Sequence, residues 1–328
     1  MSENKKQGDW LTYRPDIKVL DCTVRDGGLI NNHHFDDEFV KAVYQANVAA
    51  GVDYMEVGYK GDKALYPPSK HGTWKHCDED TLRRIVGDNP SDLKLAVMAD
   101  AERTNYKRDI LPKSESVIDL IRVACYIHQV PLAIDMVKDA VDKGYEVMLQ
   151  LMAVSAVNEG DLDAALAEAA KSDAGGVYIV DSFGSLYSEQ IRALTLKYLA
   201  ALKGTGKEVG IHAHNNQQLA YANTIEAIIS GASRVDATFA GIGRGAGNCP
   251  MELILGFLHN PKFVMRPVLE CTQKIFAPLA KEMDWGYSIP YALTGQLNRH
   301  PSAAIEFRAG KTPDDYVSFY DQLVEEYS

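Results

Sequence analysis

Two histidines separated by one residue are the part of the chain whose types and spacing most directly suggest chemistry. His212 and His214 follow an apolar run that begins at Val209, and two asparagines come directly after them. If the run forms a β-strand, residues two apart point to the same side, so both imidazoles project together. Such a pair can hold one metal ion, although histidines that alternate by chance along a strand would show the same spacing.

A carboxylate near the start of the chain could complete a set of metal ligands. The run from Ile17 to Gly28 reads IKVLDCTVRDGG, a strand-like segment that ends in Arg25, Asp26 and two glycines. One carboxylate and two imidazoles form a facial ligand set that leaves positions open for a substrate. Asp26 could instead be an ordinary turn residue, because Asp and Gly are common in turns. The metal interpretation therefore requires a fold that brings residue 26 to residues 212 and 214.

Alternating strand-like and helix-like segments predict such a fold. Eight apolar runs read as strands, with helix-like segments between them; the runs are 19–22, 52–57, 93–98, 117–123, 146–152, 175–180, 209–212 and 234–238. Eight strand–helix units with continuously apolar strands indicate the α/β class and a (β/α)8 TIM barrel. The competing architecture is a doubly wound open sheet, which usually has Gly-x-Gly-x-x-Gly after its first strand. The turn here reads TVRDGG, which favours the barrel.

The barrel accounts for most of the chain. We expect a polar N-terminal segment at 1–16, a TIM-barrel catalytic domain at 17–261 and a C-terminal helical extension at 262–328. The extension mixes charged and aromatic residues, which is typical of helices that pack on the barrel mouth or on a partner chain.

The predicted strand ends carry an unusual number of polar residues. In TIM barrels the catalytic groups lie at these ends, and the first and seventh strands are near neighbours in a closed ring of eight. Besides the possible metal ligands, we expect the polar strand-end residues to contact substrate, namely Glu56, Gln150 and Asp181. Each has a simpler alternative: Glu56 could pair with Lys60 or a core arginine, and Asp181 could cap the next helix. The glycine-rich run after the eighth strand could hold a phosphate, but it lacks a Gly-Lys-Ser/Thr ending.

The composition narrows the choice of partners and compartment. The 328 residues carry a net charge of −11 with no basic stripe, which argues against nucleic acid and against an anionic membrane surface as partners. The five cysteines lack metal-finger spacing, so we expect free thiols in a reducing compartment. We find no apolar signal core at the N-terminus and no run long enough to cross a bilayer. These features predict a cytoplasmic protein.

Three segments resemble the signature segments of the DRE-TIM metallolyases, the HMGL-like barrels that include pyruvate carboxyltransferase domains. They are DCTVRDGG at 21–28, HAHN at 212–215 and the segment from Gly241 to Pro250. The pattern is most similar to the 4-hydroxy-2-oxovalerate aldolases, which the runs at 121–124 and 177–182 also resemble. The resemblance extends from about Lys18 to Leu255, with a weaker echo near 286–300.

The resemblance implies a cofactor and several roles. It implies a divalent metal, commonly Mn²⁺ in the aldolases with Mg²⁺, Co²⁺ or Zn²⁺ as alternatives, held by Asp26, His212 and His214. Asn248 matches a position beside or on the metal in relatives, and Arg25 matches the arginine that steadies the pyruvate enolate. Tyr291 falls in a segment similar to the active-site tyrosine segment of the aldolases.

The chain departs from the aldolase pattern at one position that matters for proton transfer. The aldolases carry a histidine shortly after Arg-Asp-Gly, where this chain has Leu29. His33 aligns with a second histidine of that pattern, and either His33 or His34 could act as the base or be a solvated loop residue. The long loop at 59–76 also differs, and its lysines could meet an anionic substrate, namely Lys60, Lys63 and Lys70.

We therefore expect a metal-dependent class II aldolase, a carbon–carbon lyase that acts on a small pyruvate-derived 2-oxo acid. One alternative is a Claisen-type acyltransferase that uses an acyl-CoA, as isopropylmalate and homocitrate synthases do; those usually carry a regulatory domain after the barrel, for which residues 262–328 are too short. Another is a non-catalytic metal-binding barrel that partners an aldehyde dehydrogenase, since family aldolases often pair with one. We also expect a homo-oligomer.

Overall fold

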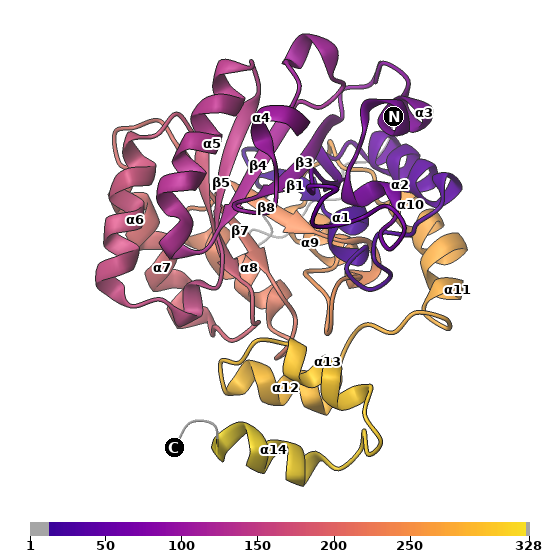
Figure 1. Cartoon of the computed structure of the whole chain (residues 1–328), viewed down its shortest axis with the longest axis vertical. Coiled ribbons are helices and arrows are strands. Elements are labelled where there is room, and N and C mark those ends of the chain that lie inside the picture. The colour runs from indigo at the N-terminus through magenta and orange to yellow at the C-terminus, as the bar shows by residue number, and fades with distance from the viewer. Residues whose placement is uncertain (1–12, 326–328) are drawn as a thin grey trace, which may run out of the picture.

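The eight predicted strands form a closed parallel barrel in sequence order (Figure 1). The computed structural model describes residues 13–325. β1 pairs with β2 on one side and with β8 on the other, which closes the ring and confirms the predicted TIM barrel. The strands are β1 Lys18–Asp21, β2 Tyr54–Tyr59, β3 Lys94–Asp100, β4 Leu120–Cys125, β5 Glu146–Leu151, β6 Gly176–Asp181, β7 Glu208–Ala213 and β8 Arg234–Ala237.

Amphipathic helices cover the outside of the barrel. Local signals set their ends: the Asp36 side chain accepts a hydrogen bond from the Phe39 amide at 2.7 Å, and Gly51 ends the same helix in the left-handed region at φ 72°. The α-helices of the barrel part are α1 Thr23–Gly27, α2 Asp37–Ala50, α3 Glu79–Val86, α4 Tyr106–Asp109, α5 Val130–Asp142, α6 Glu159–Lys171, α7 Ser188–Ala201, α8 Ala220–Ser230 and α9 Met251–Leu258. α10 Met265–Cys271, the first helix of the C-terminal extension, packs against α2. Among residues 13–325, none of the helices combines the length and hydrophobicity needed to cross a bilayer.

Alternate residues of the strands fill the barrel interior in layers. At the end where the strands begin, Arg234 bridges Glu146 and Glu208 at 2.6 Å each. An apolar layer follows, which includes Leu20, Leu120 and Tyr178. The next inward positions along the strands are polar and buried, and they include Glu56, Arg122, Gln150, His212 and Asp236. The barrel is thus plugged below this polar layer and can present chemistry only at its C-terminal mouth.

The C-terminal extension covers part of that mouth. Its last three helices form a small cluster at one end of the molecule, coloured yellow in Figure 1: α12 Ile289–Gln296, α13 Ser302–Arg308 and α14 Tyr316–Glu325. The cluster meets the loops after β5 and β8, because Asn298 donates a hydrogen bond to the Ser155 carbonyl at 2.9 Å and Tyr291 packs against Gly245. α11 Ala277–Leu279 lies on the connection to the barrel.

Candidate metal centre and active site

The structure brings Asp26, His212 and His214 together. Asp26 lies in α1, directly after β1, and the histidines lie at the end of β7 and just beyond it. Asp26 Oδ2 lies 3.3 Å from His212 Nε2 and 3.7 Å from His214 Nε2, and all three side chains are buried. One ligand atom from each residue lies within 4.8 Å of the other two. Three potential metal ligands that are far apart in the sequence therefore face one point.

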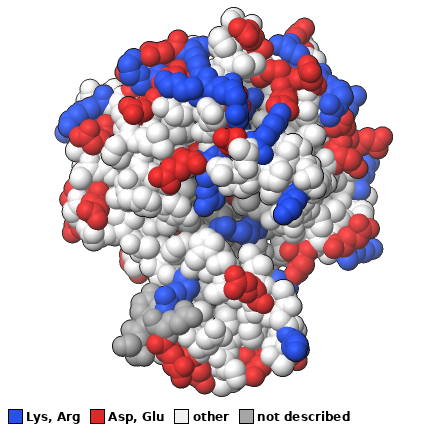
Figure 2. All heavy atoms as spheres, viewed as in Figure 1, with Lys and Arg blue, Asp and Glu red and all other residues white. Residues whose placement is uncertain are grey.

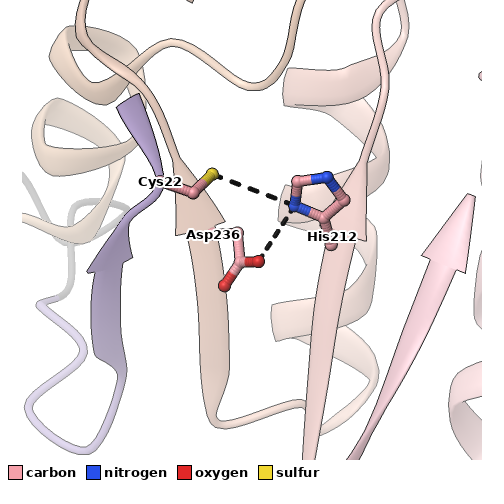
Figure 3. Close-up of side chains that lie close together, drawn as sticks. All are labelled: Cys22, His212 and Asp236. Atoms are coloured by element: carbon pink, nitrogen blue, oxygen red, sulfur yellow. Dashed lines mark hydrogen bonds and ion pairs between the residues drawn. The ribbon is translucent and has the colours of Figure 1, made fainter. Parts of the chain in front are cut away.

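Fixed hydrogen bonds orient both imidazoles. His212 Nδ1 lies 2.9 Å from Asp236 Oδ2 (Figure 3). His214 Nδ1 lies 3.1 Å from the Asp181 carbonyl oxygen. A carboxylate and a carbonyl can only accept, so both Nδ1 atoms carry a proton, and Nε2, which faces Asp26, is the nitrogen of each ring left to bind a metal. Cys22 Sγ also lies near His212 Nδ1, at 4.0 Å, but that nitrogen is already committed to Asp236 (Figure 3). Cys22 therefore borders the centre and does not form a separate one.

Unpartnered buried atoms at this point fit a divalent metal. Among residues 13–325, His212 Nε2 and Asn248 Oδ1 are buried without a hydrogen-bond partner. The Asn248 amide group donates to the Ile242 carbonyl at 3.0 Å, and its backbone pairs with that of His214. A Cβ at Gly243 would lie 2.1 Å from Asn248 Nδ2, so glycine is required there for Asn248 to approach. Carboxylate, imidazole and amide donors together suit a first-row divalent ion such as Mn²⁺.

The surroundings keep Asp26 ionised and His214 neutral, which are the protonation states that bind a metal. Burial raises the pKa of Asp26, but Arg25 and His212 outweigh it and hold that pKa well below its ordinary value. Burial lowers the pKa of His214 to about 3, so its imidazole is neutral. Burial also lowers the pKa of His212, but the neighbouring carboxylates of Asp236 and Asp26 leave it raised. A metal would therefore compete with a proton mainly at His212.

Six buried side chains around the centre form a closed ring of hydrogen bonds and ion pairs. Arg25 donates to Asp26 and to Glu56 at 2.6 Å each. Arg122 donates to Glu56 at 2.9 Å and to Asp236 at 2.5 Å. Asp236 accepts from His212, whose other nitrogen faces Asp26 and closes the ring. The ring holds the side chains of Arg25 and His212 in fixed orientations, as hydrogen bonds to metal ligands do in other metal sites.

A cavity of about 150 Å³ opens beside this centre at the barrel mouth. It is close to the size of cavity that holds one benzene-sized molecule (about 150 Å³). Arg25, Asp26, both histidines and Gln150 line it. The cavity also has lining residues that the sequence did not single out, which include Tyr59, Lys75, Asp100, Arg103, Arg244 and His300.

Comparison with known proteins identifies the family. A model of the HMGL-like family matches residues 16–273. The chain belongs to the HMGL-like family. It is 35% identical over 256 residues to oxaloacetate decarboxylase of Mycobacterium tuberculosis, covering 76% of this chain and 71% of the relative. It is 31% identical over 279 residues to 4-hydroxy-2-oxovalerate aldolase of Thermus thermophilus, covering 83% and 78%.

Solved structures agree with this assignment. The N-terminal domain of a Bacteroides vulgatus protein, named as a candidate aldolase, is 29% identical with a TM-score of 0.79, and the match covers 92% of this chain and 100% of that chain. Hydroxymethylglutaryl-CoA lyase of Pseudomonas aeruginosa shares the fold at 17% identity, with a TM-score of 0.64 and coverage of 81% and 94%. The resemblance to DRE-TIM enzymes is thus confirmed, and this HMGL-like protein is an enzyme of the carbon–carbon lyase type.

Two expected catalytic side chains of this HMGL-like barrel do not line the cavity. His33 is buried with its ring edge-on to Tyr59, at 5.2 Å between ring centroids, and burial lowers its pKa to about 3. Tyr291 packs on Gly245, and its hydroxyl accepts a hydrogen bond from Arg308 at 3.2 Å. Leu29, where the aldolases have histidine, does line the cavity. In this conformation neither His33 nor Tyr291 is placed to touch a substrate there.

Of the three residues expected to contact substrate in this HMGL-like barrel, one lines the cavity and two lie outside its lining. Gln150 lines the cavity and accepts a hydrogen bond from Arg122 at 2.9 Å. Glu56 lies behind the cavity, where its carboxylate binds two arginines. Asp181 also lies outside the lining, because its carboxylate accepts from the amides of Ser185 and Leu186 at 3.0 and 3.2 Å. Glu56 therefore supports Arg25, and Asp181 shapes the loop after β6.

Replacing Asp236 with Asn is expected to weaken metal binding by about 10–100-fold, the usual effect of losing such a supporting partner. The neutral amide would no longer raise the basicity of the His212 ring through Nδ1. Calorimetric titration of metal-free protein with Mn²⁺ would measure the affinity. Asp173→Asn is the matched control, because Asp173 is exposed on the surface. An unchanged affinity in Asp236→Asn would contradict the supporting role.

Proposed function

We propose that this HMGL-like enzyme is a metal-dependent class II aldolase that cleaves or forms a 4-hydroxy-2-oxo acid through a pyruvate enolate. Mn²⁺ is the proposed ion, with Mg²⁺, Co²⁺ and Zn²⁺ as alternatives. The main support is the convergence of Asp26, His212 and His214 beside Arg25 in a small cavity. The relatives named 4-hydroxy-2-oxovalerate aldolase support the same reaction type.

Arg25 is suited to the charge that develops during carbon–carbon cleavage. A divalent cation, when bound, would act as a Lewis acid toward the enolate oxygen. Two nitrogens of the Arg25 guanidinium are taken by Asp26 and Glu56, whereas Nη2 is buried and has no partner among the described residues. Since Arg25 lines the cavity, this remaining donor is available to the same developing negative charge. A preorganised donor of this kind contributes about 2.7–4 kcal/mol in other enzymes.

A second candidate is decarboxylation of a 2-oxo dicarboxylate. It would release CO₂ and leave the same pyruvate enolate, but no hydroxyl proton has to be removed. Aldol cleavage needs a base for that proton, and Leu29 lies in the cavity where the aldolases carry histidine. Leu29 packs with Tyr59, Met98 and Ala124, which makes that part of the lining poor in bases. The relative named oxaloacetate decarboxylase fits this alternative.

Deuterium exchange into pyruvate tests the enolate directly. With Mn²⁺ and pyruvate in D₂O, the enzyme is expected to exchange the methyl protons at least about tenfold faster than Mn²⁺ alone, because the site stabilises the enolate. NMR would follow the loss of the methyl signal, and a chelator should abolish it. A non-catalytic barrel would give no exchange, and that result would overturn the proposal. An acyltransferase would instead release free CoA from an acyl-CoA and a 2-oxo acid.

Two further assays separate the candidate reactions. A screen of aldehydes with pyruvate and Mn²⁺, read by product mass, would identify an aldolase and its second substrate. Release of CO₂ from oxaloacetate above the rate with Mn²⁺ alone would identify the decarboxylase. We further propose a cytoplasmic homo-oligomer, with an aldehyde dehydrogenase as the partner of the aldolase. Native mass measurement with and without such a dehydrogenase would test the assembly.

A further inference from the structure

Lys75 is a buried cation in the cavity lining, and no carboxylate of the described residues forms an ion pair with it. It ends the short 3-10 helix η1 (Thr73–Lys75) in the loop between β2 and α3 and is 5% exposed. Its Nζ lies 3.8 Å from the centre of the Tyr59 ring and 4.1 Å from that of Tyr66. No carboxylate among residues 13–325 lies within ion-pair distance of it. The two rings hold the ammonium in place without neutralising its charge.

Neighbouring lysines show how a structural lysine is paired in the same loop. Lys60 is also 5% exposed, but its Nζ donates to the Cys77 carbonyl at 2.7 Å and lies 3.8 Å from Glu79. Lys63 pairs with Asp78 at 2.7 Å on the surface. A buried ammonium without such partners is costly, and burial lowers the pKa of Lys75 to about 8. The contrast indicates that the counter-ion of Lys75 comes from a ligand.

Lys75 lies near the metal centre, because Lys75 and Arg25 both contact the aromatic ring of Tyr59. Arg25 Cζ lies 6.0 Å from the centre of the same Tyr59 ring, so Tyr59 links the two cations along the cavity wall. Arg25 is paired with Asp26 and Glu56, whereas Lys75 interacts with Asp100 only at longer range. Figure 2 shows Lys and Arg atoms gathered in the hollow where the barrel meets the C-terminal helices. The metal ligands thus line one part of the cavity, and the ammonium group of Lys75 lines another.

We propose that Lys75 binds a second anionic group of the substrate, so that the substrate is a 2-oxo acid with an anion at its far end. The inference rests on the proposed function for the other end, where the 2-oxo acid group would meet Arg25 and the metal ligands. A cavity of about 150 Å³ limits the substrate to a short chain. The distal anion is a carboxylate or a phosphate-type group, because an ammonium between two rings recognises either by charge.

Calorimetry with a matched pair of ligands tests this without turnover. The Mn²⁺-loaded enzyme is expected to bind 2-oxoglutarate at least about tenfold more tightly than 2-oxopentanoate, which has a methyl group in place of the distal carboxylate, since only the carboxylate can make a charge-assisted contact with Lys75. Lys75→Met should abolish the preference and leave 2-oxopentanoate binding unchanged, because methionine retains the apolar stem between the rings. Lys63→Met is the control and should keep the preference. 3-Phosphonopyruvate serves as a third ligand. If it binds more tightly than 2-oxoglutarate, the site prefers a phosphate-type anion; if it binds more weakly, the site prefers a carboxylate.

The outcomes separate this inference from the proposed function. Equal binding of the two ligands by the wild-type enzyme, which requires no variant, would overturn the role of Lys75. A preference retained in Lys75→Met would do the same, even if pyruvate exchange is normal, because pyruvate has no distal group. A preference for the dianion without any pyruvate exchange would support the anion site and overturn the enolate chemistry.

Discussion

His212→Ala is expected to eliminate metal binding and to reduce turnover by on the order of 10³-fold or more. The substitution removes the Nε2 atom that lies 3.3 Å from Asp26 and leaves one imidazole, one carboxylate and the weakly binding amide oxygen of Asn248, a set that rarely holds a divalent ion tightly. Asp26→Asn is expected to have the same effect, because the anionic ligand becomes neutral. Mass spectrometry of the metal content, together with kcat for whichever substrate the screens identify, would measure both losses.

The control for these variants is His128→Ala, which removes an exposed histidine from the loop after β4. Circular dichroism should show that all three proteins are folded, because the barrel core lies below the polar layer. Wild-type metal content in both His212→Ala and Asp26→Asn would mean that the ion, if any, binds elsewhere.

Arg25→Ala is expected to retain metal and to lose about 10²–10³-fold in kcat, the usual effect of removing one donor to a developing oxyanion. The substitution leaves all metal ligands in place but removes the unpartnered Nη2 from the cavity. It also leaves Glu56 with one arginine in place of two, so some loss of stability is expected. Arg25→Lys keeps the charge beside Glu56 without the guanidinium fork and should separate the two effects.

The matched control is Arg192→Ala, since Arg192 is an exposed arginine of α7 that pairs with Glu226 on the surface. Turnover and metal content of this variant should match the wild type. Near wild-type kcat in Arg25→Ala would contradict the enolate role, whereas loss of metal in that variant would assign Arg25 to holding Asp26.

The sequence predicted the barrel and the meeting of Asp26 with the histidines because both follow from regular geometry. A strand places alternate side chains on one side, and ring closure brings β1 next to β8 and near β7. The same reasoning could not distinguish Gln150, which faces the cavity, from Glu56, which lies behind it. Both are polar residues on inward positions, and only their partners separate them.

Residues contributed by irregular segments were harder to find. The loop at 59–76 was expected to supply Lys60, Lys63 or Lys70, but Lys75 is the lysine that lines the cavity. Loop conformation depends on contacts with the rest of the protein, and a helix or strand period gives no help there. Asp100 was missed because β3 continues two residues beyond its apolar run. His300 reaches the cavity from the C-terminal extension, a placement that depends on how α12 and α13 pack on the mouth.

The ring of six buried ionisable side chains also limits which substitutions this enzyme can accept during evolution. Each member lies against two others, so exchanging one leaves two buried neighbours short of a partner. A substitution of Glu56 would therefore require a compensating substitution of Arg122 or Arg25, the two residues that donate hydrogen bonds to it. New substrate preferences can arise much more freely on the outer loops, where side chains such as Lys75 are not bound into the ring.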